Sequence, residues 1–551
     1  MKMKFPSLSM TDLRRSARWW GLSLWLLAGA ALAGLSPAAI EARFELVAGD
    51  HILQVAGERV VEPQLLTAVY EHAGFRPFWN RPEALSALRR WIDRTGDEGL
   101  VPDDYHRDRL AQAGLDPLDR ELLATDAFLM LAVHLATGKT DPRTLFSGWN
   151  FVPRVSLPLS PARLVAVLAQ GEIDAYLEGL LPADGYAALR QAFLRYRRIA
   201  RQGGWPPVPP GGSLRLGDRG PRVALLRRRL VLSGDLAPAG EAEASVFDAA
   251  LAAAVRRFQA RHFLEADGVV GRRTLQALNV PVGRRLAQLR VNLERLRWLH
   301  HALPPTYLRV EVPAFTLWRI EAGEPVWQAA VQVGRPRFPT PIFHDRITYL
   351  VFNPTWTVPR RIARWELVPK LLEDPPGFLR RYRMELLTPD GRVVDPATVD
   401  WTTVTPRRFP YILRQRPGPG NALGRVKFMF PNRYHVYLHD TPSQALFRKP
   451  RRAFSHGCVR VAHAMELAQA LLHANGPDWD RQRIEAVLAA GDPRPVVLKR
   501  PMPIYLLYLT AAVDAAGQVQ FRPDLYHRDR TVLHALAAEP VEKAAALGLV
   551  D

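Results

Sequence analysis

Apolar residues recur at spacings of three and four through the first part of the chain, from about residue 44 to residue 201. The segments 82–94 and 118–137 show this spacing clearly, and it predicts helices with a buried face. Between them, the run 97–106 is rich in turn-forming residues and predicts a break. Acidic and histidine residues are scattered through this region, so we predict a helical scaffold domain over 44–201 without a catalytic role.

A second helical domain is predicted after a linker. Residues 202–213 are rich in Pro and Gly, a composition that excludes a helix or an inner strand. From 214 to 280, two apolar faces at helical spacing and a third, shorter one indicate a compact bundle of three helices. The apolar positions are Val223, Leu226 and Leu230, then Phe247, Leu251, Val255 and Phe258, then Leu275 and Leu278.

From Tyr307 onward the apolar period changes to two. The segments 308–312, 326–333, 349–352 and 434–438 alternate or are rich in β-branched and aromatic residues, which predicts strands. We therefore predict a mainly β domain over 300–535 and a multi-domain α+β fold class for the chain. Residues 361–416 interrupt the β pattern with helical sequence and a Pro-Pro-Gly turn. An insertion of this length in a β domain is usually functional, and we predict a lid over a site.

The first 33 residues have the layout of an export signal. Basic residues precede an apolar stretch from Trp19 to Ala33, which ends in Ala-Leu-Ala. A stretch of about 15 residues is short for a helix that spans a bilayer, which needs about 20. Both a cleaved signal peptide and an anchor in the inner membrane fit residues 1–33. Either one predicts that the protein acts outside the cytoplasm.

Composition and charge narrow the choice of partner. The 551 residues are 48% hydrophobic and 23% charged, as in a folded protein, and the length suits several domains. The 74 Lys and Arg residues against 54 Asp and Glu residues give a net charge of +20, which favours an anionic polymer as partner. Export excludes nucleic acid as the expected partner and leaves membrane lipid or cell-wall polymer.

The candidate chemistry centres on Cys458, the single cysteine of the chain, which excludes an intramolecular disulfide. It lies in the run Ser-His-Gly-Cys-Val-Arg, 19 residues after His439. A Cys-His pair suits acyl transfer, because the imidazole accepts the thiol proton and later protonates the leaving amine. Gly457 allows close approach of the backbone to a substrate, so amides here are candidate oxyanion donors. Arg460 is a candidate ligand for a substrate carboxylate.

Other members of the site are less defined by the sequence. Asp440 adjoins His439, but neighbours on a strand point to opposite faces, so a backbone carbonyl, with that of Asp440 as a candidate, is the expected partner of the imidazole. His456 is assigned to hydrogen bonding or substrate contact within the site. If 435–439 is a strand, His435 and His439 lie about 13 Å apart, too far to share an ion. We predict no metal and no cofactor.

Two parts of the chain resemble known families. Residues 214–280 resemble the peptidoglycan-binding-1 module, with the marks Leu-Gly-Asp-Arg-Gly, Phe258-Gln259 and Thr274 through Asn279; Arg227 replaces a frequent Gln. The run 455–460, His439 and the strand sequence Phe-Asn-Pro-Thr-Trp at 352–356 resemble the L,D-transpeptidases with a YkuD-type domain. Taken together, the chain resembles the large multi-domain L,D-transpeptidases of the Gram-negative periplasm.

The resemblance carries specific expectations. It implies a YkuD-type β-sandwich, peptidoglycan as partner, a role in cell-wall biogenesis and cell shape, and inhibition by carbapenem-type β-lactams. It also implies that Cys458 attacks a stem peptide after its third residue, expels the terminal D-Ala and transfers the acyl group to a neighbouring stem, forming a direct 3-3 cross-link.

Two alternatives remain open. One is a hydrolase with the same Cys-His pair, a peptidoglycan L,D-carboxypeptidase or endopeptidase, in which water replaces the acceptor amine. The other is a wall-binding scaffold without catalysis. The presence together of His439, Gly457, Cys458 and Arg460 argues against the second.

Overall fold

The computed structural model describes residues 35–46, 54–152, 157–183, 185–238, 245–476 and 478–550. The chain forms two compact units. The first consists of Met1–Thr140, Ser156–Leu181 and Ala538–Asp551, and the second of Asp141–Val155 and Pro182–Ala537. The export signal expected over 1–33 lies outside the described residues. Within those residues, every helix is too short or too polar to cross a membrane.

The first unit is helical, and its centre is the long helix α6. The predicted helices 82–94 and 118–137 are confirmed as α4 and α6. Asp116 accepts hydrogen bonds from the first turn of α6, Pro117 occupies its first position, and every residue from 121 to 136 is buried. The helices are α2 (Pro37–Glu45), α3 (Pro63–Ala73), α4 (Pro82–Arg94), α5 (Arg107–Leu110), α6 (Pro117–Thr137), α8 (Pro161–Gln170) and α9 (Ile173–Gly179), with a hairpin of β1 (Gln54–Val55) and β2 (Glu58–Arg59).

The second unit begins with helical elements. The predicted three-helix bundle is present as α11 (Pro221–Leu232), α12 (Ala249–Arg261) and α13 (Arg272–Leu278), and its apolar faces form one core. The helix α14 (Val282–Leu299) follows and packs along α10 (Tyr186–Arg201). The bundle also contacts the hairpin of β16 (Ala511–Val513) and β17 (Val519–Phe521), where Arg261 donates to the Val519 carbonyl at 3.3 Å.

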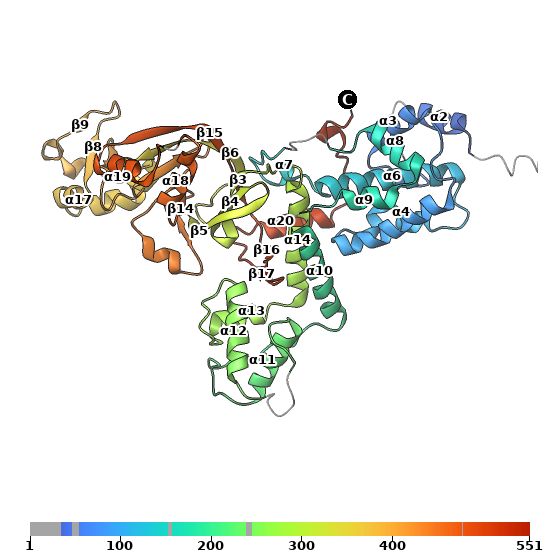
Figure 1. Cartoon of the computed structure of the whole chain (residues 1–551), viewed down its shortest axis with the longest axis horizontal. Coiled ribbons are helices and arrows are strands. Elements are labelled where there is room, and N and C mark those ends of the chain that lie inside the picture. The colour runs from blue at the N-terminus through green and yellow to red at the C-terminus, as the bar shows by residue number, and fades with distance from the viewer. Residues whose placement is uncertain are drawn as a thin grey trace, which may run out of the picture. The chain divides into compact units, whose positions relative to one another are not determined.

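The remainder of the second unit is mainly β. Nine strands form one sheet in the order β13-β5-β14-β12-β11-β6-β15-β3-β4, and β4 pairs back onto β5. The expected β-sandwich is thus a single sheet that closes on itself around one core (Figure 1). The strands are β3 (Tyr307–Glu311), β4 (Thr316–Glu321), β5 (Glu324–Gly334), β6 (Phe343–Phe352), β11 (Val426–Met429), β12 (Leu438–His439), β13 (Ala453–Ser455), β14 (Val459–Val461) and β15 (Arg494–Leu507); the helices α18 (Ala464–His473), α19 (Arg481–Ala489) and α20 (Asp529–Ala537) accompany them.

One predicted strand is wrong. Of residues 434–438, only Leu438 belongs to a strand, because the Asn432 side chain holds the preceding residues in a turn. Asn432 Oδ1 accepts hydrogen bonds from the amides of Tyr434 and Val436, and His435 has a positive φ of 54°. The argument that His435 and His439 lie too far apart to share a metal ion assumed a strand over 435–439. That assumption is therefore wrong as well.

The insertion is a small subdomain with its own core. Its elements are β7 (Trp356–Thr357), α15 (Arg360–Ile362), α16 (Val368–Leu371), α17 (Pro375–Arg381), β8 (Met384–Leu387), β9 (Val393–Val394) and β10 (Ile412–Gln415). The strands form a separate sheet in the order β7-β10-β8-β9. The predicted Pro-Pro-Gly turn is the first turn of α17, because Asp374 caps the helix and proline is well tolerated there.

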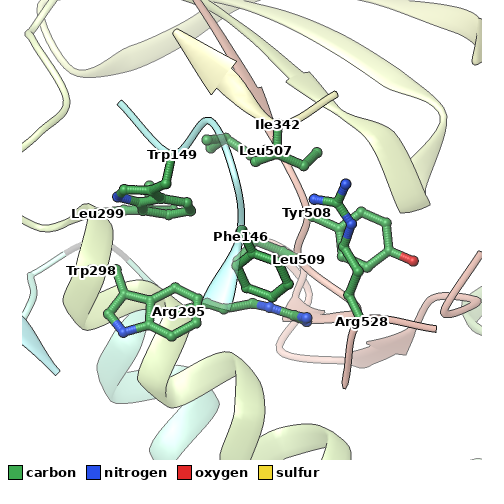
Figure 2. A pocket seen from close by; sticks show the side chains of 10 residues that line it. All are labelled: Phe146, Trp149, Arg295, Trp298, Leu299, Ile342, Leu507, Tyr508, Leu509 and Arg528. Atoms are coloured by element: carbon green, nitrogen blue, oxygen red, sulfur yellow. The ribbon is translucent and has the colours of Figure 1, made fainter. Parts of the chain in front are cut away.

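A short segment that precedes α8 in the chain also belongs to the second unit, and its residues 141–152 are called the strap. Residues 141–152 include α7 (Pro142–Leu145), and Trp149 and Phe151 pack against the core of the closed sheet. Figure 2 shows Phe146 and Trp149 of the strap around a small cavity with Trp298 of α14 and Tyr508. The strap thereby adds aromatic packing to the edge of the β domain.

Candidate active site

Two neighbouring parallel strands align the candidate residues. In the pairing of β12 with β14, Leu438 lies opposite Val459 and His439 opposite Arg460. Continuing this register by one residue places Cys458 beside Tyr437. Since strand side chains alternate, Tyr437 and His439 share a face with Cys458 and Arg460. The rings of Tyr437 and His439 are 5.7 Å apart.

The imidazole of His439 is buried and has a defined orientation. Its Nδ1 donates a hydrogen bond to the Asp440 carbonyl at 2.6 Å, which leaves Nε2 as the proton acceptor. Burial, Arg460 and Lys427 together lower the pKa of His439 to about 3. The Asp440 carboxylate points elsewhere and accepts from the Arg425 amide at 2.9 Å. At neutral pH the imidazole is therefore an uncharged base.

Cys458 is a free thiol of a partly exposed residue. Its Sγ donates to the His435 carbonyl at 3.9 Å. Burial raises the pKa of the thiol, while hydrogen bonding to Tyr437 and the charge of Arg460 act in the opposite direction. The resting pair is accordingly a neutral thiol and a neutral imidazole, which requires proton transfer during attack.

The turn before Cys458 depends on glycine. Gly457 has a φ of 117°, in a region that side chains strongly disfavour. Its amide donates to Ser455 Oγ at 3.1 Å, and Ser455 Oγ donates to the Cys458 carbonyl at 2.5 Å. Among the described residues, none accepts a hydrogen bond from the Cys458 amide. Of the two amides proposed for an oxyanion, that of Cys458 is thus the one available.

His456 lies against the insertion. Its Nε2 is 2.5 Å from Glu366 Oε1, and the same carboxylate oxygen accepts from Arg335 at 2.9 Å. The imidazole also contacts the Arg335 guanidinium and packs on Phe338 with 4.7 Å between the ring centroids. His456 is therefore placed to connect the catalytic turn with the insertion.

Arg460 lies beside the thiol and the imidazole. Its Nη1 donates to Gln332 at 3.1 Å, and desolvation lowers its pKa. The charge remains at neutral pH, because even a lowered guanidinium pKa stays far above 7. A cation here suits a substrate carboxylate and favours the thiolate.

Sequence reasoning missed three residues at this site. Tyr437 could have been found from its position two residues before His439, which predicts the same strand face. Arg335 and Glu366 carried no such signal, because they come from β5's end and from the insertion and meet only in the folded chain. No cluster of three or more His, Cys, Asp or Glu side chains suitable for a metal ion occurs in the part of the chain that the structure describes.

Three protein families match parts of the chain. Residues 305–497 match the L,D-transpeptidase catalytic domain (YkuD), residues 219–278 a domain described as "Putative peptidoglycan binding domain", and residues 64–193 a domain described as "Scaffold domain". These matches cover the closed β domain, the three-helix bundle and much of the first unit.

A curated relative and solved structures are also similar. A protein of Haemophilus influenzae described as "Putative L,D-transpeptidase" is 33% identical over 276 residues, which is 49% of this chain and 54% of the relative. The chain thus spans about half the length of this relative. An L,D-transpeptidase structure from Xylanimonas cellulosilytica is 17% identical with a TM-score of 0.17, covering 54% of this chain and 99% of that one. One from Mycobacterium smegmatis is 14% identical with a TM-score of 0.17, covering 37% and 58%.

Proposed function

Residues 305–497 form an L,D-transpeptidase catalytic domain of the YkuD family and residues 219–278 a peptidoglycan-binding domain, and from this premise we propose that the protein cross-links peptidoglycan through a thioester on Cys458. The substrate is a pair of neighbouring stem peptides. The product is a direct bond between their third residues, and the site of action is the periplasm, reached by the export signal.

The first half of the reaction forms the acyl-enzyme. The Cys458 proton passes to Nε2 of His439 as Sγ bonds to the carbonyl carbon of the third residue. The amide of Cys458 donates to the resulting oxyanion. When the carbonyl re-forms, the bond to the terminal D-Ala breaks, and His439 gives its proton to the departing amine.

The second half transfers the acyl group. An amine of the acceptor stem attacks the thioester carbon and loses a proton to Nε2 of His439. Collapse of the tetrahedral intermediate forms the new amide and expels the Cys458 thiolate, which regains the proton from His439. Atoms and charge balance, and the enzyme returns to its neutral thiol–imidazole pair.

The hydrogen bond from His439 Nδ1 to the Asp440 carbonyl is the observation that carries this proposal. It supports a single tautomer of His439, in which Nε2 is the proton acceptor for the thiol. Fixing this tautomer does not require a carboxylate. Arg460 is proposed to bind a stem carboxylate, and His456 to hold the catalytic turn against the insertion through Glu366.

Transfer and hydrolysis differ only in the nucleophile that opens the thioester. A thioester that waits for an amine benefits from a cover that excludes water. The insertion contacts the catalytic turn through Glu366, whose carboxylate also accepts a hydrogen bond from Arg335. We therefore assign transfer to this protein, with the insertion as the cover. Phe378 of the insertion lies in the core of that subdomain and is not available for substrate contact.

Intact-mass spectrometry tests the nucleophile, because Cys458 is the only thiol. Incubation with a carbapenem should add one inhibitor mass to the wild-type protein and none to Cys458→Ala. Incubation with tetrapeptide donors and excess acceptor stems should yield cross-linked dimers. An adduct on Cys458→Ala contradicts the assignment of the nucleophile, and tripeptide as the sole product establishes the hydrolase instead.

A further inference from the structure

A large cavity with charged walls lies in the second unit, and Cys458 does not line it. It has a volume of about 790 Å³ and runs between the end of α12, the outer face of β3, β4 and β5, and the hairpin of β16 and β17. Phe263 and Leu264 contribute from the bundle side, and Trp318 and Gln328 from the closed sheet. This volume is within the range of sites that bind small ligands.

The walls combine an aromatic ring with an excess of positive charge. Arg309, Arg452 and Arg522 line the cavity, against the carboxylates of Glu311 and Asp514. Arg522 is buried, contacts Glu311, and leaves its Nε without a hydrogen-bond partner in the described chain. The Arg309 guanidinium lies 5.8 Å from the Trp318 ring centroid.

Arg452 also lines the cavity and is the third arginine there. Its guanidinium donates to the backbone carbonyls of Val331, Lys449 and Phe315 at 3.2, 2.9 and 2.8 Å, and among the described residues it has no carboxylate partner. The segment that carries it continues into β13 and reaches Cys458 six residues later. The cavity is therefore lined both by residues at the end of the three-helix bundle and by the segment that leads to Cys458.

We propose that this cavity binds the glycan strand of peptidoglycan, with sugar rings on Trp318 and carboxylates of the attached stem peptides toward the arginines. The proposal rests on the proposed function and extends it. Apolar faces of pyranose rings pack on aromatic side chains, and the amide of Gln328 suits the N-acetyl and hydroxyl groups of the strand. Holding the glycan here orients its stem peptides relative to Cys458.

Binding of peptide-free glycan strands, released from sacculi by an amidase, tests the proposal. These strands lack the stem that the active site acts on. Trp318→Ala in the full-length protein should weaken binding about fivefold. Trp327→Ala is the matched control, because Trp327 lies on β5 outside the cavity and should bind as the wild type does. Ala512→Trp, which fills the half-exposed hairpin side, should also weaken binding.

Acylation by a carbapenem separates this proposal from the proposed function. All three variants should be acylated at Cys458 at the wild-type rate, which also shows that they are folded. Unchanged glycan binding in both Trp318→Ala and Ala512→Trp would overturn the glycan site. A wild-type protein that is never acylated would contradict the proposed function and leave the glycan-binding result standing.

A separate observation points to a positioning residue beyond the matched catalytic domain. The Tyr526 hydroxyl donates to the Gly334 carbonyl at 2.7 Å and accepts from the Thr340 amide at 3.1 Å. Thr340 Oγ1 donates in turn to the Gly457 carbonyl at 2.8 Å. Two hydrogen bonds thus lead from Tyr526 through Thr340 to Gly457, the residue before Cys458.

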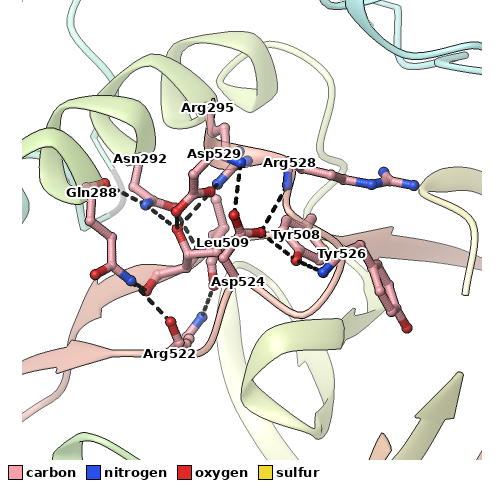
Figure 3. A network of polar contacts seen from close by, with 11 residues as sticks. Gln288, Asn292, Arg295, Tyr508, Leu509, Arg522, Asp524, Tyr526, Arg528 and Asp529 are labelled. Atoms are coloured by element: carbon pink, nitrogen blue, oxygen red, sulfur yellow. Dashed lines mark hydrogen bonds and ion pairs between the residues drawn. The ribbon is translucent and has the colours of Figure 1, made fainter. Parts of the chain in front are cut away.

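A polar network holds Tyr526 in place. Figure 3 shows the Tyr526 amide bonded to the Tyr508 hydroxyl, which donates to Asp524. Asp524 also accepts from the amides of Arg528 and Asp529 at 2.9 and 3.1 Å. The two tyrosine rings stack with 5.5 Å between their centroids. The ring of Tyr526 therefore has little freedom to move.

We infer that Tyr526 positions the catalytic turn through Thr340. Tyr526→Phe removes the hydroxyl alone and should lower the rate constant of Cys458 acylation about tenfold, with little change in reversible binding of the carbapenem. Tyr505→Phe is the matched control, because its buried hydroxyl donates to the Ala302 carbonyl at 3.1 Å and does not belong to the network that holds Tyr526. It should lower the melting temperature and leave the acylation rate near that of the wild type.

A double variant distinguishes positioning from general stability. Thr340→Val should slow acylation as Tyr526→Phe does, and the combination should cost no more than the larger single effect, since both break one connection. Equal acylation rates for Tyr526→Phe and the wild type, or equal losses in Tyr526→Phe and Tyr505→Phe, would overturn the inference.

Discussion

Glu366 Oε1 lies 2.5 Å from His456 Nε2, so the insertion is bonded to the residue that stands two positions before the nucleophile. The same oxygen accepts from Arg335. This contact is the direct connection between the insertion and the catalytic turn, and it makes the function of the insertion testable by a single substitution.

Glu366→Gln should change the products more than the acylation. The amide keeps the shape but loses the charge that pairs with Arg335, and the partly exposed pair contributes only about 0–1 kcal/mol to stability. We expect carbapenem acylation within about twofold of wild type and a shift from cross-linked dimer toward hydrolysed tripeptide. Muropeptide analysis by chromatography measures the ratio.

Glu385→Gln controls for the loss of a charge within the insertion. Glu385 pairs with Arg414 and Arg416 inside that subdomain and should leave the product ratio unchanged. An equal shift in both variants would assign the effect to the insertion's own stability.

The pH profile of acylation should lack the usual break near the histidine pKa. Because burial, Arg460 and Lys427 lower the pKa of His439 to about 3, the neutral base is present throughout the range above that value. The acid limb should therefore lie well below 6, whereas an ordinary histidine would place it at about 6.5. Above neutral pH the rate should rise as the thiol, whose pKa is raised, begins to ionise.

Lys427→Met tests whether nearby positive charge helps to lower the pKa of His439. Removing this nearby positive charge makes protonation of His439 easier, so the acid limb should move to higher pH. Stopped-flow measurement of acylation between about pH 2.5 and about pH 9 covers both the wild-type limb near 3 and the ordinary histidine value of about 6.5. A break at the ordinary histidine value in the wild type would contradict the buried neutral imidazole.

Asp440→Asn should have little effect on acylation. The imidazole is oriented by the Asp440 backbone carbonyl, which the substitution preserves, while the side chain serves the Arg425 amide. We expect a change of about threefold or less, against a loss of about 100-fold or more for His439→Ala. A loss in Asp440→Asn comparable to that of His439→Ala would show that the carboxylate belongs to a catalytic triad.

Tyr437→Phe should raise the pKa of the Cys458 thiol further. The Tyr437 hydroxyl stabilises the thiolate, and a phenyl ring cannot. Alkylation by iodoacetamide as a function of pH reports thiolate directly, and its midpoint should move to higher pH. Tyr434→Phe, a tyrosine of the neighbouring turn, should leave the midpoint in place.

Arg261→Ala should destabilise the second unit strongly. Arg261 forms a buried ion pair with Asp235 at 2.5 Å, with 6% and 1% of the two side chains exposed. Leaving Asp235 buried without its partner costs about 3–5 kcal/mol. Urea denaturation followed by tryptophan fluorescence measures the loss. Arg481→Ala breaks an exposed pair with Glu485 and should leave the urea midpoint near that of the wild type.

The sequence by itself determined the fold class and singled out Cys458 as the candidate nucleophile. Helical spacing over 82–94 and 118–137, and the three apolar faces between 214 and 280, depend on neighbours along the chain, so their elements were predictable. The Ser-His-Gly-Cys-Val-Arg run was likewise readable because all its members lie within six positions. The carbonyl of Asp440 was a candidate partner for the His439 imidazole, because the side chains of neighbouring strand residues point to opposite faces.

The tertiary structure alone decided how distant segments complete the site. The closed sheet depends on long-range pairings such as that of β15 with β3, although β4 and β5 form a local hairpin. The meeting of Glu366, Arg335 and His456 is likewise long-range. The turn at 434–437 looked like a strand because its residues are apolar and aromatic, yet the Asn432 side chain competed for their amides. Tyr526 reaches Gly334 across 192 residues, and no local pattern encodes a contact made by folding at that separation.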